Sequence, residues 1–276
     1  MTTPIFKCPV CKEALRKEKN SYICEKRHTH DIAKEGYVNL LLAQHKRSKN
    51  PGDSDEMIRS RQAFLNQGYY ATLSNAIIKE IKAMPQSFKQ TILDLGCGEG
   101  YYMQELLLAS KDSTLSLSGI DISKSAVKLA GKRKMNTNLA VASAYDLPFF
   151  DQSFSSIVSV FSPVLATEVA RLLHDKGMVI MVGPGEEHLK GLTAHIYDEV
   201  LPHKGNYSVI DESDMFTLEK QVEVKEEISV KQKDILDLLR MTPYYWQISL
   251  DKKEKVLALS ELKTTIHFYI HIYIKA

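Results

Sequence analysis

The segment from residue 91 to residue 100 combines an apolar, partly β-branched run with three alternating glycines. Asp94 interrupts the run, and the pattern becomes helical from residue 101 to residue 109. This order predicts a buried parallel strand, a tight turn and a helix. Such a turn lets the backbone approach a ligand closely and directs a helix N-terminus at it. The glycines of the turn are Gly96, Gly98 and Gly100.

Two ligands of similar shape suit a turn of this kind. The fingerprint for a nicotinamide dinucleotide requires a glycine at its sixth position, which is Tyr101 in this chain. S-adenosylmethionine (SAM) has no phosphates and carries a cationic amino group and a sulfonium, which Asp94 is placed to attract. The pattern therefore favours SAM, and by itself it resembles motif I of SAM-dependent methyltransferases.

Three cysteines near the N-terminus have the spacing of metal ligands. With a following histidine they form the pattern Cys-x2-Cys-x12-Cys-x3-His. Three thiolates and one imidazole satisfy tetrahedral zinc, and four protein ligands leave no open position, so the ion is expected to be structural. A segment this short cannot bury a core, and the metal must supply its folding free energy, on the order of 10 kcal/mol. The predicted ligands are Cys8, Cys11, Cys24 and His28, with His30 as the competing fourth ligand.

The composition is that of an ordinary globular protein. Of the 276 residues, 44% are hydrophobic and 25% are charged, and the net charge is +2. No apolar run reaches the ~18 residues of a membrane-spanning helix, and the N-terminus lacks the apolar core of a signal peptide, which favours the cytoplasm. The first 50 residues hold eleven basic and five acidic side chains. This basic segment indicates either a polyanion-binding surface or an ordinary solvated face.

Strand and helix patterns alternate from residue 91 onward, which predicts an α/β fold with a doubly wound, Rossmann-like sheet. The expected strands are 91–95, 115–122, 138–143, 156–161 and 178–182, and the expected helices are 101–109, 124–134 and 165–174. The C-terminal part is expected to contain helices 187–201 and 234–241 and strands 222–230 and 265–273. Helical patterns also cover 55–64 and 70–84. The predicted organisation is a zinc-binding RNA-recognition domain (1–35), a linker with covering helices (36–90) and a SAM-dependent methyltransferase domain (91–276).

The polar residues that follow these strands converge on one edge of the predicted sheet. Ligands of doubly wound sheets bind at the carboxyl ends of the strands, where an acid can accept both hydroxyls of a ribose. Asp121 ends the second strand and is the candidate for that role. The residues expected at this edge are Asp94, Gly96, Gly98, Asp121, Ser143 and Phe161.

Taken over nearly its full length, the chain resembles the bacterial 23S rRNA guanine-N1 methyltransferases of the RlmA/RrmA family. The resemblance lies in the cysteine spacing, in Asn50-Pro-Gly-Asp-Ser54, and in residues 19–24, 33–41, 44–48, 94–102 and 241–243. It implies a SAM donor, a guanine in a 23S rRNA hairpin as acceptor, a structural zinc ion and a homodimer. The SAM-binding pattern of the family falls on Tyr70, Gly98, Glu99 and His188.

Some features of the chain leave the mechanism open. Ser143 stands where many methyltransferases carry an acid for the adenine amine, and the absence of an Asn-Pro-Pro-Tyr motif leaves the catalytic base unassigned. The target base must leave its stack, and four aromatic residues are candidates to receive it. They are Tyr101, Tyr102, Tyr245 and Trp246. The alternative functions are a quinone-type small-molecule methyltransferase and a non-catalytic, zinc-containing rRNA-binding protein.

Overall fold

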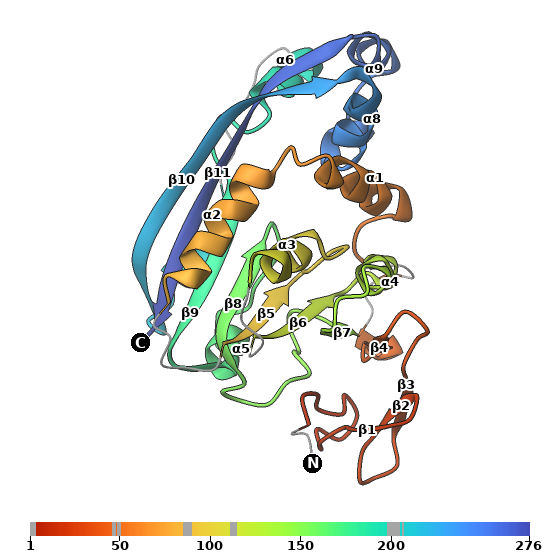
Figure 1. Ribbon diagram of the computed structural model, residues 1–276, viewed down its shortest axis with the longest axis vertical. Coiled ribbons are helices and arrows are strands. Elements are labelled where there is room, and N and C mark those ends of the chain that lie inside the picture. Colours follow the sequence, from red (N-terminus) through yellow and green to blue (C-terminus); the bar gives the residue numbers. More distant parts are fainter. Residues whose placement is uncertain are drawn as a thin grey trace.

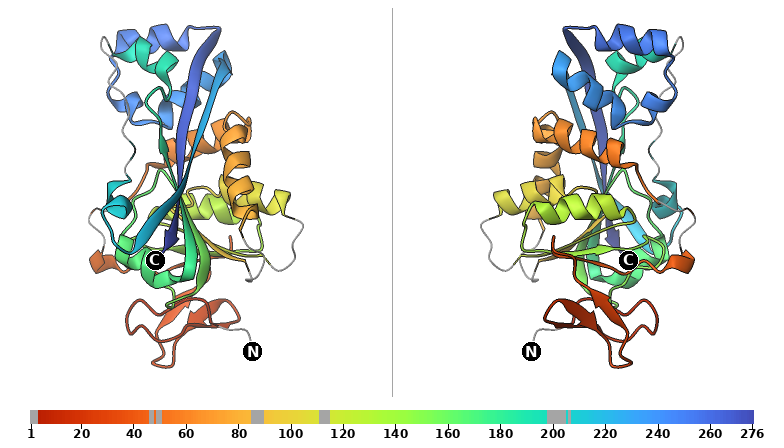
Figure 2. Two further views of the ribbon diagram at one scale, coloured as in Figure 1. Left: turned by 90° about the vertical axis from the view of Figure 1, so that its left-hand side faces the viewer. Right: turned by 90° about the vertical axis from the view of Figure 1, so that its right-hand side faces the viewer.

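The structure is a computed structural model that describes residues 4–45, 48, 51–84, 90–110, 115–197, 205 and 207–276. It consists of a large mixed sheet flanked by helices and a small N-terminal module (Figure 1). This module lies at the opposite end of the molecule from helices α8 and α9 (Figure 2). Some residues that the sequence analysis covers lie outside the described residues. They are the basic residues Lys46, Arg47 and Lys49, Pro85, which follows the predicted helix 70–84, and residue 201, at which the helix predicted for 187–201 ends.

Five buried parallel strands form the centre of the large sheet. The first strand, β5, pairs with β6 on one side and with β8 on the other. The chain adds β6 and β7 on one side of β5 and then returns to add β8 and β9 on the other side. This change of side between β5 and β8 creates a crevice at their carboxyl ends. The five strands are β5 (Thr91–Leu95), β6 (Ser116–Asp121), β7 (Asn138–Val141), β8 (Phe154–Val160) and β9 (Leu173–Pro184). The prediction of a doubly wound sheet is confirmed.

Three further strands complete the sheet in the order β10-β11-β9-β8-β5-β6-β7-β4. The edge strand β4 (Tyr37–Asn39) lies parallel to β7 and was not predicted, because three residues are too few to show a periodic pattern. On the other side, β10 (Phe216–Lys231) and β11 (Glu261–Lys275) form a long antiparallel ribbon that extends beyond the parallel strands (Figure 1). Both are longer than predicted. In β10 the alternation is interrupted by Lys220 and Glu226, which share a face with the buried Val224, and by a register shift between Leu218 and Lys220.

Helices cover both faces of the sheet and its carboxyl edge. Ser54 and Ser123 cap two of them by accepting backbone N–H groups, as is typical of serine at this position. The helix predicted for 187–201 begins later, at Lys190, and the helix predicted for 165–174 ends at Leu172, where β9 begins. The α-helices are α1 (Asp55–Asn66), α2 (Ala71–Lys82), α3 (Tyr101–Ala109), α4 (Lys124–Lys132), α5 (Ala166–Leu172), α6 (Lys190–Ile196), α7 (Ser208–Asp211), α8 (Gln232–Arg240) and α9 (Leu250–Leu257). The 3-10 helices are η1 (Ala43–His45) and η2 (Pro243–Trp246).

The hydrophobic core lies in two layers, one on each face of the sheet. Because side chains alternate along a strand, Ile92 of β5 packs in one layer, and Leu93 and Leu95 pack in the other. Asp94 has the same parity as Ile92 and is buried with it between the sheet and helices α2 and α3. An acidic side chain in this position is costly unless it has a function or a partner.

The N-terminal module is a three-stranded antiparallel sheet that contacts the loop before β8. Its strands are β1 (Arg16–Glu18), β2 (Ser21–Ile23) and β3 (Thr29–Asp31). The buried ring of Phe6 lies 5.4 Å from that of Phe149, and the Lys7 N–H donates to the Pro148 carbonyl at 2.8 Å. An ion pair between Lys12 and Asp146 at 2.9 Å adds a polar contact. The module is therefore attached to the large sheet by both apolar and backbone contacts.

Among the described residues, no helix is both long enough and apolar enough to cross a membrane.

Candidate functional site

The glycine turn between β5 and α3 has the backbone conformation that glycine alone adopts readily. Gly96, Gly98 and Gly100 have φ angles of +80°, +55° and +85°. A side chain at Gly96 would also be impossible for lack of space, because its Cβ would lie 2.1 Å from the Ser162 hydroxyl oxygen. The N–H groups of residues 96 and 97 donate to the Ile120 carbonyl at 2.9 and 2.8 Å. The turn is thus held against the end of β6.

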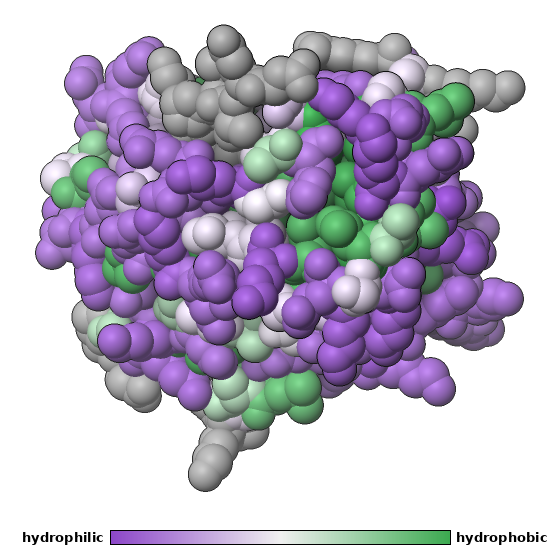
Figure 3. Space-filling view, turned by 90° about the horizontal axis from the view of Figure 1, so that it is seen from above, coloured by the Kyte–Doolittle hydropathy of each residue, from purple (hydrophilic) through white to green (hydrophobic). Residues whose placement is uncertain are grey.

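A cavity of about 720 Å³ lies at the carboxyl edge of the sheet, in the crevice between β5 and β8. Helix α1, the glycine turn and η2 enclose it. Its size is that of a site for a drug-sized ligand. Seen from above, the molecule shows a hydrophobic area recessed among hydrophilic side chains (Figure 3). Six of the eight residues predicted to bind the cofactor line the cavity, and they are Tyr70, Gly96, Gly98, Glu99, Asp121 and His188.

The other two predicted residues, Asp94 and Ser143, are absent from the cavity lining. Asp94 lies in the adjoining apolar layer, where burial and the nearby carboxyl groups of Asp121 and Glu99 raise its pKa to about 7. At neutral pH it is therefore poised between its charged and neutral forms. Ser143 accepts a hydrogen bond from the Tyr145 N–H at 3.2 Å and forms a local turn with Asp146. The contacts of Asp94 and Ser143 with SAM stay predictions.

Asp121 projects into the cavity from the end of β6. Its Oδ1 accepts the Ser123 N–H at 2.8 Å, and its Oδ2 accepts the Gly98 N–H at 3.0 Å. Burial raises the pKa of Asp121, while these two hydrogen bonds act in the opposite direction. Each carboxylate oxygen keeps a further lone pair, so the side chain can accept two ribose hydroxyls without releasing the turn.

Glu99 has a partner that the sequence did not indicate. The Arg133 guanidinium, just after helix α4, pairs with the Glu99 carboxylate, and its Nε also donates to the Glu99 carbonyl at 2.8 Å. The two side chains are almost completely buried. Arg133 also donates to Asn66 at 2.9 Å and to Gln104. One arginine therefore ties the glycine turn to helices α1 and α3.

Tyr70 and His188 meet at the far wall of the cavity. The His188 Nδ1 accepts the His267 N–H at 3.3 Å, which leaves the proton of a neutral imidazole on Nε2. Nε2 lies 3.4 Å from the Tyr70 hydroxyl oxygen and can donate to it. The buried Tyr70 hydroxyl has a raised pKa, chiefly because of its burial, and keeps its own proton. The pair thus offers a directed O–H donor.

Phe161, which the sequence placed at this edge of the sheet, lines the cavity. The cavity is also lined by Asp53 and Arg61, which were not among the predicted binding residues. Phe161 has a φ angle of +56°, which is rare for a bulky side chain, and 49% of its surface is exposed. Such strain is commonly found at functional sites. Arg61 pairs with Asp53 at 2.6 Å in the wall formed by α1 and the loop before it. The sequence signal for Asp53 was the Asn50-Pro-Gly-Asp-Ser54 motif, which had no assigned role.

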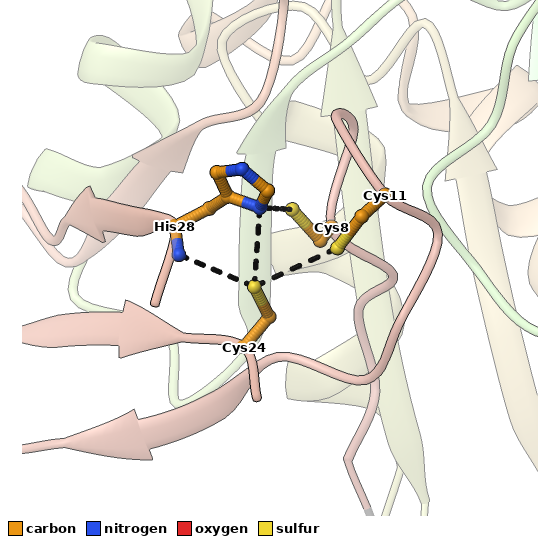
Figure 4. A group of neighbouring side chains, drawn as sticks. All are labelled: Cys8, Cys11, Cys24 and His28. Carbon is orange, nitrogen blue, oxygen red and sulfur yellow. Dashed lines mark hydrogen bonds between the residues drawn. The ribbon is translucent and has the colours of Figure 1, made fainter. Parts of the chain in front are cut away.

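The four predicted zinc ligands converge in the N-terminal module, with their sulfur atoms and the His28 ring directed toward one another (Figure 4). All four ligand atoms lie within 4.8 Å of one another. The distance between the Cys11 and Cys24 sulfurs is 3.6 Å, and the His28 Nδ1 lies 3.3 Å from the Cys24 sulfur. Tetrahedral Zn–S bonds of about 2.3 Å place two sulfurs roughly 3.8 Å apart, so the cluster fits zinc. His30 lies 3.8 Å from the Cys8 sulfur but is not part of the group of four.

Comparison with known proteins identifies both parts of the chain. Residues 6–49 match the zinc-ribbon family described as the N-terminal part of RlmA, and residues 92–177 match a methyltransferase domain family. A Bacillus subtilis protein named putative 23S rRNA (guanine-N(1)-)-methyltransferase YxjB is 32% identical over 94% of this chain and 92% of that protein. The chain belongs to the 23S rRNA (guanine-N1)-methyltransferase family.

Other members and structures agree with this membership of the 23S rRNA (guanine-N1)-methyltransferase family. A Streptomyces fradiae relative, named 23S rRNA (guanine(748)-N(1))-methyltransferase, is 32% identical over 68% of the chain and 66% of its own length. The solved structure of a SAM-dependent methyltransferase from Aquifex aeolicus superposes on this chain with a TM-score of 0.52 and 13% sequence identity. The superposition covers 82% of this chain and 100% of the Aquifex aeolicus chain. This likeness confirms the predicted methyltransferase fold. SAM as the cofactor and zinc as a structural ion are likewise supported by the two family matches.

Proposed function

We propose that this protein transfers the methyl group of SAM to N1 of a guanine in a hairpin loop of 23S rRNA, and that it does so as a homodimer. The observation that carries the proposal is the 32% identity to a relative of that name, because the match extends over 94% of the chain. It therefore includes the zinc ribbon as well as the methyltransferase domain. A quinone-type methyltransferase function would leave the zinc ribbon without a purpose.

The cavity lining supplies groups suited to the ribose and to the methionine part of SAM. Asp121 holds the ribose hydroxyls, and the glycine turn accommodates the methionine part. The Tyr70 hydroxyl, oriented by His188, is placed to donate to the methionine carboxylate. Gly98 has nothing within 4 Å of its missing side chain, so a ligand can approach its backbone. Bound SAM supplies a methyl group that is activated by its sulfonium.

The acceptor base enters on the side of the cavity formed by Phe161, Ser162 and Pro163. The exposed ring of Phe161 offers an apolar face for a guanine that has left its stack. Guanine N1 must lose its proton during the reaction, and we assign no side chain to remove it. The chain contributes by holding N1 in line with the methyl group and by excluding water, which can account for a large part of the acceleration.

The zinc ribbon provides cations for the RNA backbone. Lys12 and Arg16 are engaged in ion pairs, with Asp146 and Glu25. Five further basic residues of the ribbon are exposed, namely Lys17, Lys19, Lys26, Arg27 and Lys34. Lys19 and Arg27 have φ angles of +51° and +66°, a conformation that costs about 1–2 kcal/mol for residues other than glycine. The presence of long cations in this strained conformation favours a role in binding phosphates.

The test is methyl transfer from radiolabelled SAM to unmodified 23S rRNA transcribed in vitro, followed by mass mapping of the modified nucleotide. We expect label on N1 of one hairpin guanine. For each phosphate contacted in single-stranded parts, the logarithm of the RNA affinity should fall by about 0.7 per tenfold increase in salt concentration. Transfer to a quinone precursor instead of RNA, or RNA binding without transfer, would refute the proposal. Light scattering of the purified protein tests the homodimer.

A further inference from the structure

The 3-10 helix η2 has one side in the cavity and the other on the surface of the protein. Tyr244 and Gln247 line the cavity, whereas 62% of the surface of Trp246 is exposed. Trp246 is the single tryptophan of the chain. Its ring forms a T-shaped pair with the Tyr245 ring, with the centroids 5.1 Å apart. A large aromatic surface therefore lies exposed next to the wall of the cavity.

Two cationic side chains lie against the Tyr245 ring of this aromatic pair. The Lys253 ammonium lies 3.8 Å from the centroid of the Tyr245 ring, and the Arg240 guanidinium lies 5.5 Å from it. Arg240 is also paired with Glu56, at 2.9 Å. Exposed aromatic rings flanked by lysine or arginine are the combination that binds single-stranded nucleic acid, because bases stack on the rings while the cations contact phosphates.

The other aromatic candidates are placed differently. Tyr101 and Tyr102 line the interior of the cavity, and only 5% of the surface of Tyr101 is exposed. Tyr101 therefore has no free face for a nucleotide outside the cavity. Trp246 ends η2, which connects α8 to α9, and these two helices lie at the opposite end of the molecule from the zinc ribbon (Figure 2). A contact at Trp246 would therefore be separate from the phosphate contacts of the ribbon.

We propose that Trp246 stacks on a base of the substrate RNA next to the target guanine, and that Lys253 contacts a neighbouring phosphate. This inference rests on the proposed function, since it requires an RNA substrate. A nucleotide held here lies beside the wall formed by Tyr244 and Gln247, so it positions the adjacent nucleotide at the mouth of the cavity. The charge around Tyr245 favours RNA over an apolar protein partner as the occupant.

The single tryptophan provides a direct measurement. The protein is titrated with in vitro transcripts of 23S rRNA hairpins while the fluorescence of the indole is excited selectively, and methylation is measured in the same samples. Stacking on a base is expected to quench the fluorescence of Trp246. Methylation without quenching would overturn the stacking role but not the proposed function. Quenching without methylation would refute the proposed function and support the contact, and the absence of both would overturn both.

Variants separate stacking from a structural role. For Trp246→Ala we expect the KM for RNA to rise on the order of tenfold, the typical effect of removing one stacked base. The kcat and the KM for SAM should be unchanged, and Trp246→Phe should restore most of the RNA affinity. Leu250→Ala is the matched control, because Leu250 is also exposed (78%) and lies at the start of α9. An equal effect of Leu250→Ala, or a change of oligomeric state in Trp246→Ala, would overturn the proposal.

Discussion

The buried ion pair between Glu99 and Arg133 leads to a sharp prediction about the glycine turn. The carboxylate of Glu99 is 1% exposed and the side chain of Arg133 is 8% exposed. In Arg133→Met the carboxylate loses its cationic partner, and Gln62 remains as a donor at 3.3 Å. Removal of one partner from a buried pair costs about 3–5 kcal/mol, because the other charge stays buried without compensation. We expect a loss of this size in the free energy of unfolding.

The same substitution should weaken SAM binding. Arg133 holds the Glu99 carbonyl as well as its carboxylate, so its loss releases the turn that faces the cofactor. The assays are urea unfolding followed by circular dichroism and titration calorimetry with SAM. The double variant Glu99→Gln/Arg133→Met should recover part of the lost stability, since it no longer buries an unpaired charge.

An exposed ion pair serves as the control for this experiment. Arg16 and Glu25 lie 3.2 Å apart, with 65% and 69% of their side chains exposed. Because water and salt screen such a pair, Arg16→Met should change the free energy of unfolding by no more than about 1 kcal/mol. If Arg133→Met cost no more than Arg16→Met, the ion pair would not stabilise the turn and the reasoning would be refuted.

Three further predictions concern the metal, the buried acid and the turn. Cys24→Ser should lose zinc and RNA methylation but keep SAM binding, because metal binding supplies about 10 kcal/mol of the folding free energy of the ribbon. Metal analysis and titration calorimetry with SAM check this. Because the pKa of Asp94 is raised to about 7 in the folded protein, the free energy of unfolding should fall as the pH rises from about 4 to 7. SAM affinity should rise through pH 7, since the carboxylate ionises there. Asp94→Asn should flatten both pH profiles. Gly96→Ala should abolish SAM binding, because the added methyl group would clash with the Ser162 side chain. Gly68 has a φ angle of +82° but no neighbour within 4 Å of an added Cβ, so Gly68→Ala should lower the free energy of unfolding by only about 1–2 kcal/mol.

Local patterns in the sequence were sufficient for the central elements. The bounds of β5 and α3 agree with the prediction to the residue, because a glycine turn ends one element and begins the next. Ser123 stands directly before the predicted helix 124–134 and caps α4, as is typical of serine at this position. The long strands β10 and β11 and the edge strand β4 were predicted too short or not at all. Their lengths depend on pairing with distant strands, which leaves no local signal.

The spacing of residues in the sequence therefore determined the chemistry of this protein: four ligands suited to zinc, and an acid and a glycine turn suited to SAM. Only the tertiary structure decided which side chains meet. It placed Asp94 under the site and outside the cavity lining, paired Glu99 with Arg133, and left Trp246 exposed next to the cavity wall. The physical reason is that ligand spacing and turn conformation depend on neighbouring residues, whereas burial and ion pairing depend on elements that are remote in the chain.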